Sequence, residues 1–231
     1  MKIRLVVAKY NEDISWTQNA KNFDIDVIVY DKSNQNLKNV YDYIKVSDNY
    51  FNISNIGREA HTYIKHIIEN YHNLYDIEIF SQGSVYDHVP DFWNKVEKLI
   101  SNKIDFFDFS PARKISCLNE ESYINISSKF PHININDRGS GSYIFCASEG
   151  HKKLYSMIHD DIGQSENAYM EFGLHAIFAV SSERIKKIPL ETYKEMLNLF
   201  HVEDGSKSVS NHIYWAYEFE YAWRYIFSNK L

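Results

Sequence analysis

The chain contains little glycine and proline, only 8 and 4 among its 231 residues. These low counts exclude collagen-like and linker-rich designs and argue against extensive disorder. Its two cysteines, Cys117 and Cys146, form neither a disulfide framework nor a CxxC metal site. No run approaches the roughly 20 apolar residues of a membrane span, and the apolar run after Met1 is too short for a signal peptide. We therefore expect a soluble, cytoplasmic protein with no membrane span.

An excess of basic charge is also lacking. The sequence has 25 Lys and Arg residues against 31 Asp and Glu residues, which gives a net charge of −6. A nucleic-acid-binding protein usually has a broad basic surface. We therefore expect no nucleic-acid partner, although a local basic pocket for a small anion remains compatible with this charge.

Several catalytic and cofactor-binding motifs are absent. The 10 histidines form no HxxxH or HExxH pair, which argues against a zinc site. There is no GxSxG, Walker A or GxGxxG motif. The glycine-containing stretch GSGS at 139–142 lacks the strand–loop–helix context of a phosphate-binding loop, so we interpret it as a turn.

The hydrophobic pattern predicts an α/β fold. Short, β-branched apolar runs alternate with segments whose apolar residues recur at helical spacing. The length favours one large domain with a single core. The predicted strands are 2–8, 26–31, 76–83, 104–110 and 175–180, and the predicted helices are 57–71, 89–100, 190–200 and an aromatic segment ending at 227. In that last helix we expect the stripe of Tyr214, Trp215, Phe219, Trp223 and Phe227 to be core.

Polar clusters follow the first three predicted strands. They are AKYNED at 8–13, YDKSN at 30–34 and SQGSVYDH at 81–88. In an open α/β sheet, ligands bind beyond the carboxyl ends of the strands. The three clusters therefore mark the predicted binding crevice.

The predicted helix at 57–71 begins with an unusual pair, Gly57 and Arg58. Asn55 is a suitable N-cap, and glycine allows the backbone to approach a ligand. Free N–H groups and the helix dipole favour an anion, and the forked guanidinium of Arg58 suits phosphate. The alternative is that Arg58 pairs with a nearby carboxylate, Glu59 or Asp31, and the residues alone leave both interpretations open.

Asp87 lies in the cluster after the third strand, beside His88. An isolated aspartate in a loop usually serves as a turn or cap residue. As a metal ligand it would be a hard oxygen donor of the kind that Mg²⁺ or Mn²⁺ prefers, with substrate phosphates completing the coordination. Spacing alone does not decide between these roles.

Six segments together resemble a known domain family. They are VVAKYNEDISW, VYDKS, NIGREAHTYIKHIIENY, IFSQG followed by DH, IFAVSSERI and EYAWRYIF. In this order they are similar to a family of unknown function shared by bacteria, fungi and large DNA viruses, which includes a chlorella-virus glycosyltransferase. The resemblance runs from Val6 to Phe227 and is weakest over 111–170.

The resemblance implies a single GT-A-like, Rossmann-related domain over 1–231, with a central mixed sheet flanked by helices. A nucleotide-sugar-binding half of about 1–110 would precede an acceptor-binding half of about 111–231. It implies a UDP-sugar donor, a glycan or glycoprotein acceptor, and Mn²⁺ or Mg²⁺. The implied nucleotide-sugar-binding residues are Ala8, Tyr10, Asn11, Asp31, Arg58 and Gln82, and the implied metal ligand is Asp87.

Transfer with inversion would also need a carboxylate to deprotonate the acceptor hydroxyl. The candidates in the second half are Glu171, Asp137 and Asp161, and we favour Glu171 because it leads into the strand predicted at 175–180. The strict Asp-x-Asp motif is missing after the third strand, where Gln82-Gly83-Ser84 stands instead. A non-catalytic nucleotide- or sugar-binding module is therefore the alternative hypothesis. A metal-dependent phosphoesterase would need clustered carboxylates and histidines, which the sequence does not show.

Overall fold

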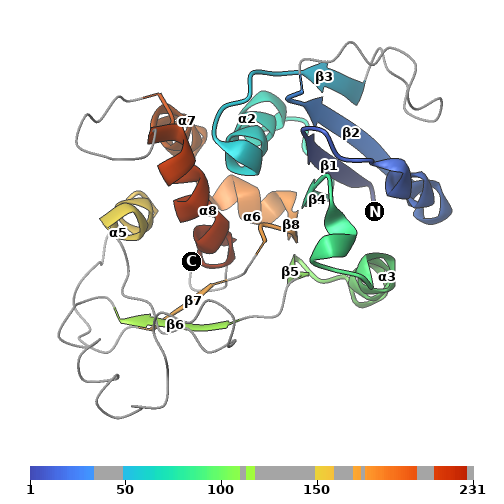
Figure 1. Cartoon of the computed structure of the whole chain (residues 1–231). Coiled ribbons are helices and arrows are strands. Elements are labelled where there is room, and N and C mark those ends of the chain that lie inside the picture. Colours follow the sequence, from blue (N-terminus) through green and yellow to red (C-terminus); the bar gives the residue numbers. More distant parts are fainter. Residues whose placement is uncertain are drawn as a thin grey trace, which may run out of the picture.

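The computed structural model describes residues 1–33, 49–109, 113–117, 149–158, 169–172, 175–201 and 211–227. Its centre is a six-stranded mixed sheet in the order β3-β2-β1-β4-β8-β5 (Figure 1). The first four of these strands are parallel, and β8 runs antiparallel to both of its neighbours. The strands are β1 Ile3–Lys9, β2 Ile25–Asp31, β3 Tyr50–Asn52, β4 Ile77–Gln82, β5 Phe106–Asp108 and β8 Phe178–Ser181.

The central strands are apolar on both faces because helices cover both sides of the sheet. Every residue of β1 is buried, as expected for a parallel strand inside an α/β fold. Its Val6 and Ala8 face one core cluster, whereas Leu5 and Val7 face another. The continuous apolar run in the sequence thus reflects two cores separated by one sheet.

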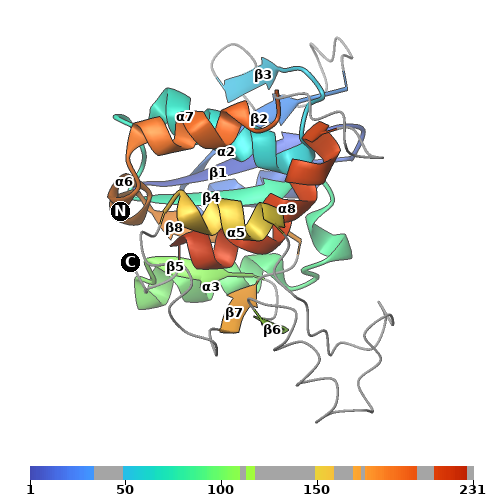
Figure 2. The same ribbon diagram turned by 90° about the vertical axis from the view of Figure 1, so that its left-hand side faces the viewer.

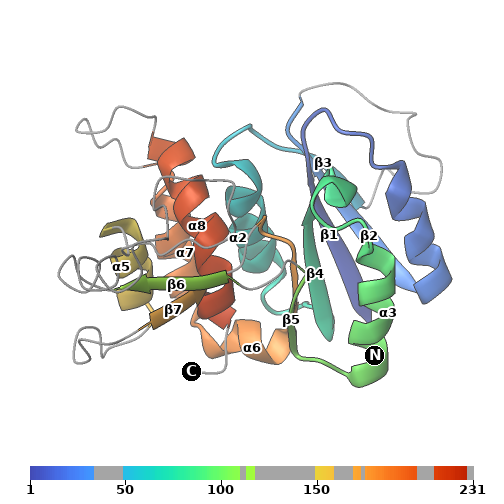
Figure 3. The same cartoon turned by 60° about the horizontal axis from the view of Figure 1, so that its bottom comes forward.

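The two helical layers are visible on either side of the sheet in Figure 3. The first layer contains α2 Arg58–Asn70, α5 Glu149–Ser156, α6 Ser182–Lys187, α7 Leu190–Asn198 and α8 Asn211–Phe227. The second layer contains the 3₁₀ segments η1 Ser15–Phe23 and η2 Val85–Asp87 and the helix α3 Phe92–Asn102. Within the first layer, α5 lies along α8 (Figure 2).

Helix α8 provides the aromatic part of the larger core. Its Trp215, Phe219, Trp223 and Phe227 are all at least 95% buried, which confirms the predicted core stripe. Tyr214 is only partly buried and packs at the edge of the cluster. The helix contacts α2 directly, so the last described helix of the chain is fixed against the helix that begins with Gly57-Arg58.

A separate two-stranded antiparallel sheet consists of β6 Arg113–Cys117 and β7 Tyr169–Phe172. Strand β7 packs against α8. With α5, these strands make up the described structure of the middle region, and Asp137 and Asp161 lie outside the described residues.

The structure confirms the predicted α/β class with a central mixed sheet flanked by helices. Strand β8 from the second predicted half pairs with β4 from the first, so both parts of the chain build one sheet. The division into two functional halves stays a prediction. Within the described ranges, the model has no helix that is both long and apolar enough for a membrane crossing.

Several predicted boundaries were wrong by two or three residues, and two of these differences bear on the site. The strand predicted from residue 175 begins only at Phe178, because His175 and Ala176 adopt positive φ angles of 69° and 48° and form a turn. The N-cap of α2 is Gly57 and not Asn55, and it has no side-chain cap.

A buried polar network anchors α2 on the sheet. Glu78 on β4 is fully buried and lies 3.4 Å from both Arg4 on β1 and His66 on α2. The hydroxyl of Tyr30 is 3.0 Å from His66 Nδ1. Burial lowers the pKa of His66 despite the neighbouring carboxylate. Arg4 and Glu78 thus tie the helix to the amino ends of β1 and β4, and Tyr30 ties it to the carboxyl end of β2.

Candidate functional site

The order in which the chain adds parallel strands to the sheet reverses at β1. The chain proceeds outwards from β1 through β2 to β3, and β4 then lies on the other side of β1. Such a switch point is the usual ligand-binding position of an open α/β sheet. At the carboxyl ends Ala8 pairs with Gln82, so the loops that follow both strands emerge side by side. Ala8 is buried, whereas Tyr10 and Asn11 are exposed.

Glu12 connects these two loops. Its carboxylate accepts a hydrogen bond from the Tyr10 N–H at 2.6 Å. It also packs against Gly83, where a Cβ atom would lie 2.7 Å from Glu12 Oε2. The indole of Trp16 donates to the Gly83 carbonyl at 2.7 Å. Gly83 is therefore required by close packing. The half-buried Glu12 lies in the predicted AKYNED cluster but was not among the predicted site residues.

Asp31, at the end of β2, is fully buried. Its carboxylate accepts hydrogen bonds from Lys9 Nζ at 3.1 Å, from the Ser33 N–H at 2.7 Å and from the Tyr50 hydroxyl. Burial alone would raise the pKa of Asp31, but these hydrogen bonds hold it below its usual value. Asp31 thus lies beneath the crevice and pairs with Lys9, which is itself 3% exposed.

Helix α2 begins with two successive residues of positive φ, Gly57 at 59° and Arg58 at 47°. A Cβ atom on Gly57 would overlap the ring of Phe200 on the α7 side and lie 2.8 Å from His61 Cβ. Glycine is therefore needed for backbone conformation and for packing against that ring. The Gly57 N–H points at His212 Nδ1, 3.5 Å away on α8.

Lys32 supports this helix start from below. It is 4% exposed and donates to the carbonyls of Ile56, at 2.6 Å, and Arg58. Burial lowers the pKa of Lys32 to about 8, against the attraction of Glu59. A buried ammonium group adds positive potential directly under the first turn of α2. Sequence reasoning missed it because Lys32 stands in a polar loop segment.

The Arg58 side chain is 46% exposed, and its Nε lies 3.6 Å from Glu59 Oε2. Its guanidinium is 5.2 Å from the centre of the Tyr217 ring on α8. Burial lowers the pKa of Arg58, but Glu59 and Glu220 together raise it. The pairing with Glu59 that the sequence allowed is therefore present, and nearly half of the side chain still faces solvent.

His175 joins three parts of the site. Its carbonyl accepts from Gln82 Nε2 at 3.4 Å, and its N–H donates to the carboxylate of Glu220 on α8. Its ring stacks on His88, with centroids 4.0 Å apart and an angle of 12°. The exposed Asp87 immediately precedes His88 in η2. The loop after β4 is thus linked to the turn before β8 and to α8.

Backbone strain is concentrated in the same region. In the described parts of the chain, five residues other than glycine have positive φ. Asp24 and Lys103 are ordinary left-handed helix C-caps. The other three are Arg58, the first residue of α2, and His175 and Ala176, in the turn before β8. Conformations of this kind cost about 1–3 kcal/mol each and cluster at functional sites.

A family model described as "Protein of unknown function (DUF3431)" matches residues 5–231. The chain belongs to the DUF3431 family. This confirms the predicted membership of a family of unknown function, and the description assigns no activity to it. No protein among the curated sequences matches the DUF3431 chain.

In the DUF3431 domain, most of the predicted site residues lie at one edge of the sheet. Ala8 lies near the end of β1, and Asp31 and Gln82 are the last residues of β2 and β4. Tyr10 and Asn11 follow β1, Asp87 follows β4, and Arg58 is the first residue of α2. Glu171 instead lies in β7, opposite Lys114 of the two-stranded sheet. Among the residues described, no group of three or more histidine, cysteine, aspartate or glutamate side chains could hold a metal ion.

His61 provides a test of the polar interior beside the site. It is 7% exposed, its Nδ1 has no hydrogen-bond partner, and its ring lies edge-on to Phe200 and His201. Burial and the charge of Lys32 lower the pKa of His61 to about 3. An unfolded histidine titrates near 6.5, so only the unfolded state gains this proton between about pH 6.5 and 3.

We therefore expect the free energy of unfolding to fall as the pH drops below about 6.5, with His61 contributing at most ~1.4 kcal/mol per pH unit. Urea unfolding at pH 7.5 and 5.5 measures this loss. His61→Leu should lose less stability than the wild type over that interval. The exposed His72 is the control, and His72→Leu should behave as the wild type. If the free energy of unfolding depends on pH equally in the wild type and in His61→Leu, the lowered pKa of His61 is contradicted.

Proposed function

We propose that the DUF3431 domain is a glycosyltransferase that moves a hexose or deoxyhexose from a UDP-sugar to a glycan or glycoprotein acceptor. The observation that carries this proposal is the convergence of Tyr10, Gln82, Asp87 and Arg58 at the carboxyl edge of parallel strands, on the switch point of the sheet. The reaction class comes from the resemblance to a family that includes a glycosyltransferase, and the geometry supports it.

The loop after β1 would bind the nucleoside. Tyr10 is 46% exposed, and an exposed aromatic ring offers a face on which a uracil base can stack. Asn11 is exposed beside it. Asp31 would support the nucleoside site indirectly. Its buried carboxylate at the end of β2 accepts hydrogen bonds from Lys9 on β1 and Tyr50 on β3 and so fixes both side chains.

The start of α2 would bind the diphosphate. Arg58 is a forked cation with nearly half of its side chain exposed. The helix N-terminus and the buried ammonium of Lys32 add positive potential at the same point. A bound diphosphate would compete with Glu59 for the guanidinium of Arg58, and the exchange favours the ligand because a diphosphate carries the greater charge.

Asp87 fits the role of a single protein ligand to Mn²⁺ or Mg²⁺. It is an exposed carboxylate on the loop after β4. Mg²⁺ is often held by one or two carboxylates together with substrate phosphates and water. When bound, the metal would supply charge that stabilises the departing diphosphate.

The transfer itself needs a base on the acceptor side. A carboxylate removes the proton from the acceptor hydroxyl, the hydroxyl oxygen bonds to the anomeric carbon, and the bond from that carbon to the β-phosphate oxygen breaks with release of UDP. Glu171 is the base proposed from the sequence. Its strand β7 packs against α8, which borders the crevice.

Turnover is tested with a panel of UDP-sugars in the presence of Mn²⁺, by measuring the release of UDP. We expect release from at least one donor and a loss of more than tenfold in Asp87→Ala, because one carboxylate ligand is removed. Asp91→Ala is the matched control, since Asp91 is an exposed carboxylate nearby that pairs with Lys95. UDP binding without any release would favour the alternative, a non-catalytic nucleotide- or sugar-binding module.

A further inference from the structure

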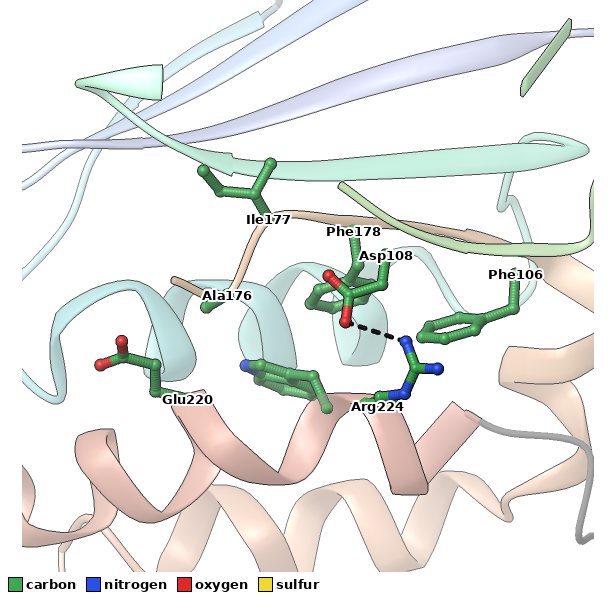
Figure 4. A pocket seen from close by; sticks show the side chains of 8 residues that line it. Phe106, Asp108, Ala176, Ile177, Phe178, Glu220 and Arg224 are labelled. Atoms are coloured by element: carbon green, nitrogen blue, oxygen red, sulfur yellow. Dashed lines mark hydrogen bonds and ion pairs between the residues drawn. The ribbon is translucent and has the colours of Figure 1, made fainter. Parts of the chain in front are cut away.

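Glu220 on α8 is a carboxylate near the proposed site that was not among the residues predicted from the sequence. It stands at one end of a pocket between α8 and strands β5 and β8, beside Ala176 (Figure 4). At the other end, Asp108 and Arg224 form an ion pair at 3.4 Å. Phe106, Phe178 and Trp223 also line this pocket. The carboxylate of Glu220 and the Asp108–Arg224 ion pair thus line the same pocket.

The surroundings of Glu220 connect it to the proposed diphosphate site. Its carboxylate accepts a hydrogen bond from the N–H of His175, within the strained turn. Arg58 on α2 and His88, which follows η2, lower the pKa of Glu220, and Glu220 in turn raises the pKa of Glu59. The Arg58 guanidinium lies 5.2 Å from the centre of the Tyr217 ring, one helical turn before Glu220 on α8. A carboxylate has about four acceptor positions. The bond from His175 therefore orients Glu220 and leaves it able to accept from a further hydroxyl.

Other carboxylates near Arg58 suit the role of a base less well. Glu59 is 7% exposed and pairs with Arg58, so it is not placed to meet an acceptor. Asp87 is exposed and is assigned to the metal. Glu220 is partly buried, and burial raises its pKa although Arg58 and the His175 N–H lower it. Burial also raises the pKa of Glu59, to about 6, so the choice between the two carboxylates rests on the lower exposure of Glu59 and its ion pair with Arg58.

Glu220 belongs to a different element from the proposed nucleotide-binding residues. The proposed nucleotide contacts come from β1, β2, β4 and α2, whereas Glu220 comes from α8, which packs against α2. The anomeric carbon of a bound UDP-sugar is attached directly to the β-phosphate. A base close to Arg58 but on a different element can therefore meet a hydroxyl that approaches this carbon.

We propose that Glu220, and not Glu171, is the general base that takes the proton from the acceptor hydroxyl. The inference rests on the proposed transferase function. The hydroxyl oxygen bonds to the anomeric carbon as its proton passes to the Glu220 carboxylate, and UDP leaves with the electrons of the broken carbon–oxygen bond. The acceptor is an alcohol of a glycan, or water when no glycan is present.

The test compares Glu220→Gln with Glu171→Gln and the wild type. The donor is the UDP-sugar that gives the fastest UDP release with the wild type, and water is the acceptor. General base catalysis contributes about 10²–10⁴-fold, so Glu220→Gln should lose at least ~10²-fold in rate. The dissociation constant for UDP should stay within about threefold of the wild type, because the carboxamide keeps the hydrogen bond from His175. Glu191→Gln, which changes an exposed carboxylate on α7, is the control.

Retained UDP binding shows that the variant is folded. The proposal is overturned if Glu220→Gln releases UDP within tenfold of the wild-type rate, or if Glu171→Gln alone loses the activity. Either result leaves the transferase function intact. If the wild type neither binds UDP nor releases it from any donor, the transferase function fails, and the role of Glu220 fails with it.

Discussion

Replacing Arg58 with glycine is expected to weaken UDP binding about tenfold to a hundredfold without destabilising the protein. A hydrogen bond to a charged group contributes about 1.5–3 kcal/mol, which corresponds to roughly this range of affinity. The φ angle of 47° is unfavourable for arginine and easily adopted by glycine. Arg58→Gly therefore removes the guanidinium while relieving backbone strain. Calorimetric titration with UDP gives the affinity, and urea unfolding gives the stability.

Two further variants separate charge from geometry. Lys65→Ala removes one positive charge from the same helix, where Lys65 pairs with Glu69, and UDP affinity should change by less than about twofold. Arg58→Lys keeps the charge but loses the bidentate fork, and its affinity should fall between those of wild type and Arg58→Gly. If Arg58→Gly binds UDP as tightly as the wild type, then Arg58 serves only the ion pair with Glu59.

Asp31→Asn is expected to cost about 3 kcal/mol in the free energy of unfolding. Asp31 is 0% exposed and Lys9 only 3%, so the substitution leaves a buried ammonium without its counter-ion. Removing one partner of a buried ion pair typically costs about 3–5 kcal/mol, whereas replacing both partners is often nearly neutral. The double variant Lys9→Met/Asp31→Asn should therefore recover most of the loss. Urea unfolding of the single and double variants gives these free energies.

Asp26→Asn is the matched control for Asp31→Asn. Asp26 lies on the same strand, but it is exposed and accepts a bond from the Tyr75 hydroxyl at 2.7 Å. Its substitution should change the stability by less than about 1 kcal/mol. A wild-type stability for Asp31→Asn would refute the structural role of the pair. If Asp31→Asn loses stability as predicted, the UDP affinity of Asp31 variants can be interpreted only under conditions in which the protein is shown to be folded.

The sequence predicted the sheet and α2 well because their patterns are local. The apolar runs that became β1, β2 and β4 are buried, and Ala60, Ile64 and Ile67 form the buried stripe of α2 as their spacing indicated. The turn at His175 and Ala176 was not predictable from HAIFAV. Apolar residues in a row indicate a strand, and nothing in this segment signals positive φ for residues other than glycine.

The candidate site was predictable in part, for a similar reason. Tyr10, Gln82 and Asp87 lie at or shortly after the carboxyl ends of predicted strands, so the topology of an α/β sheet brings them together. Lys32 and Glu220 were missed because their roles depend on partners from other segments. Lys32 acts on the carbonyls of the α2 start, and Glu220 meets His175 and Arg58 only once α8 is packed on α2.

Calorimetric titration of the wild-type protein with UDP and Mn²⁺ tests the central claim most directly. The convergence of the β1 loop, Arg58 and Asp87 predicts saturable one-to-one binding, with a dissociation constant in the micromolar to submillimolar range usual for enzyme substrates. Binding should weaken when Mn²⁺ is removed. The absence of binding to UDP in the presence of Mn²⁺, with the protein shown to be folded, would contradict the account.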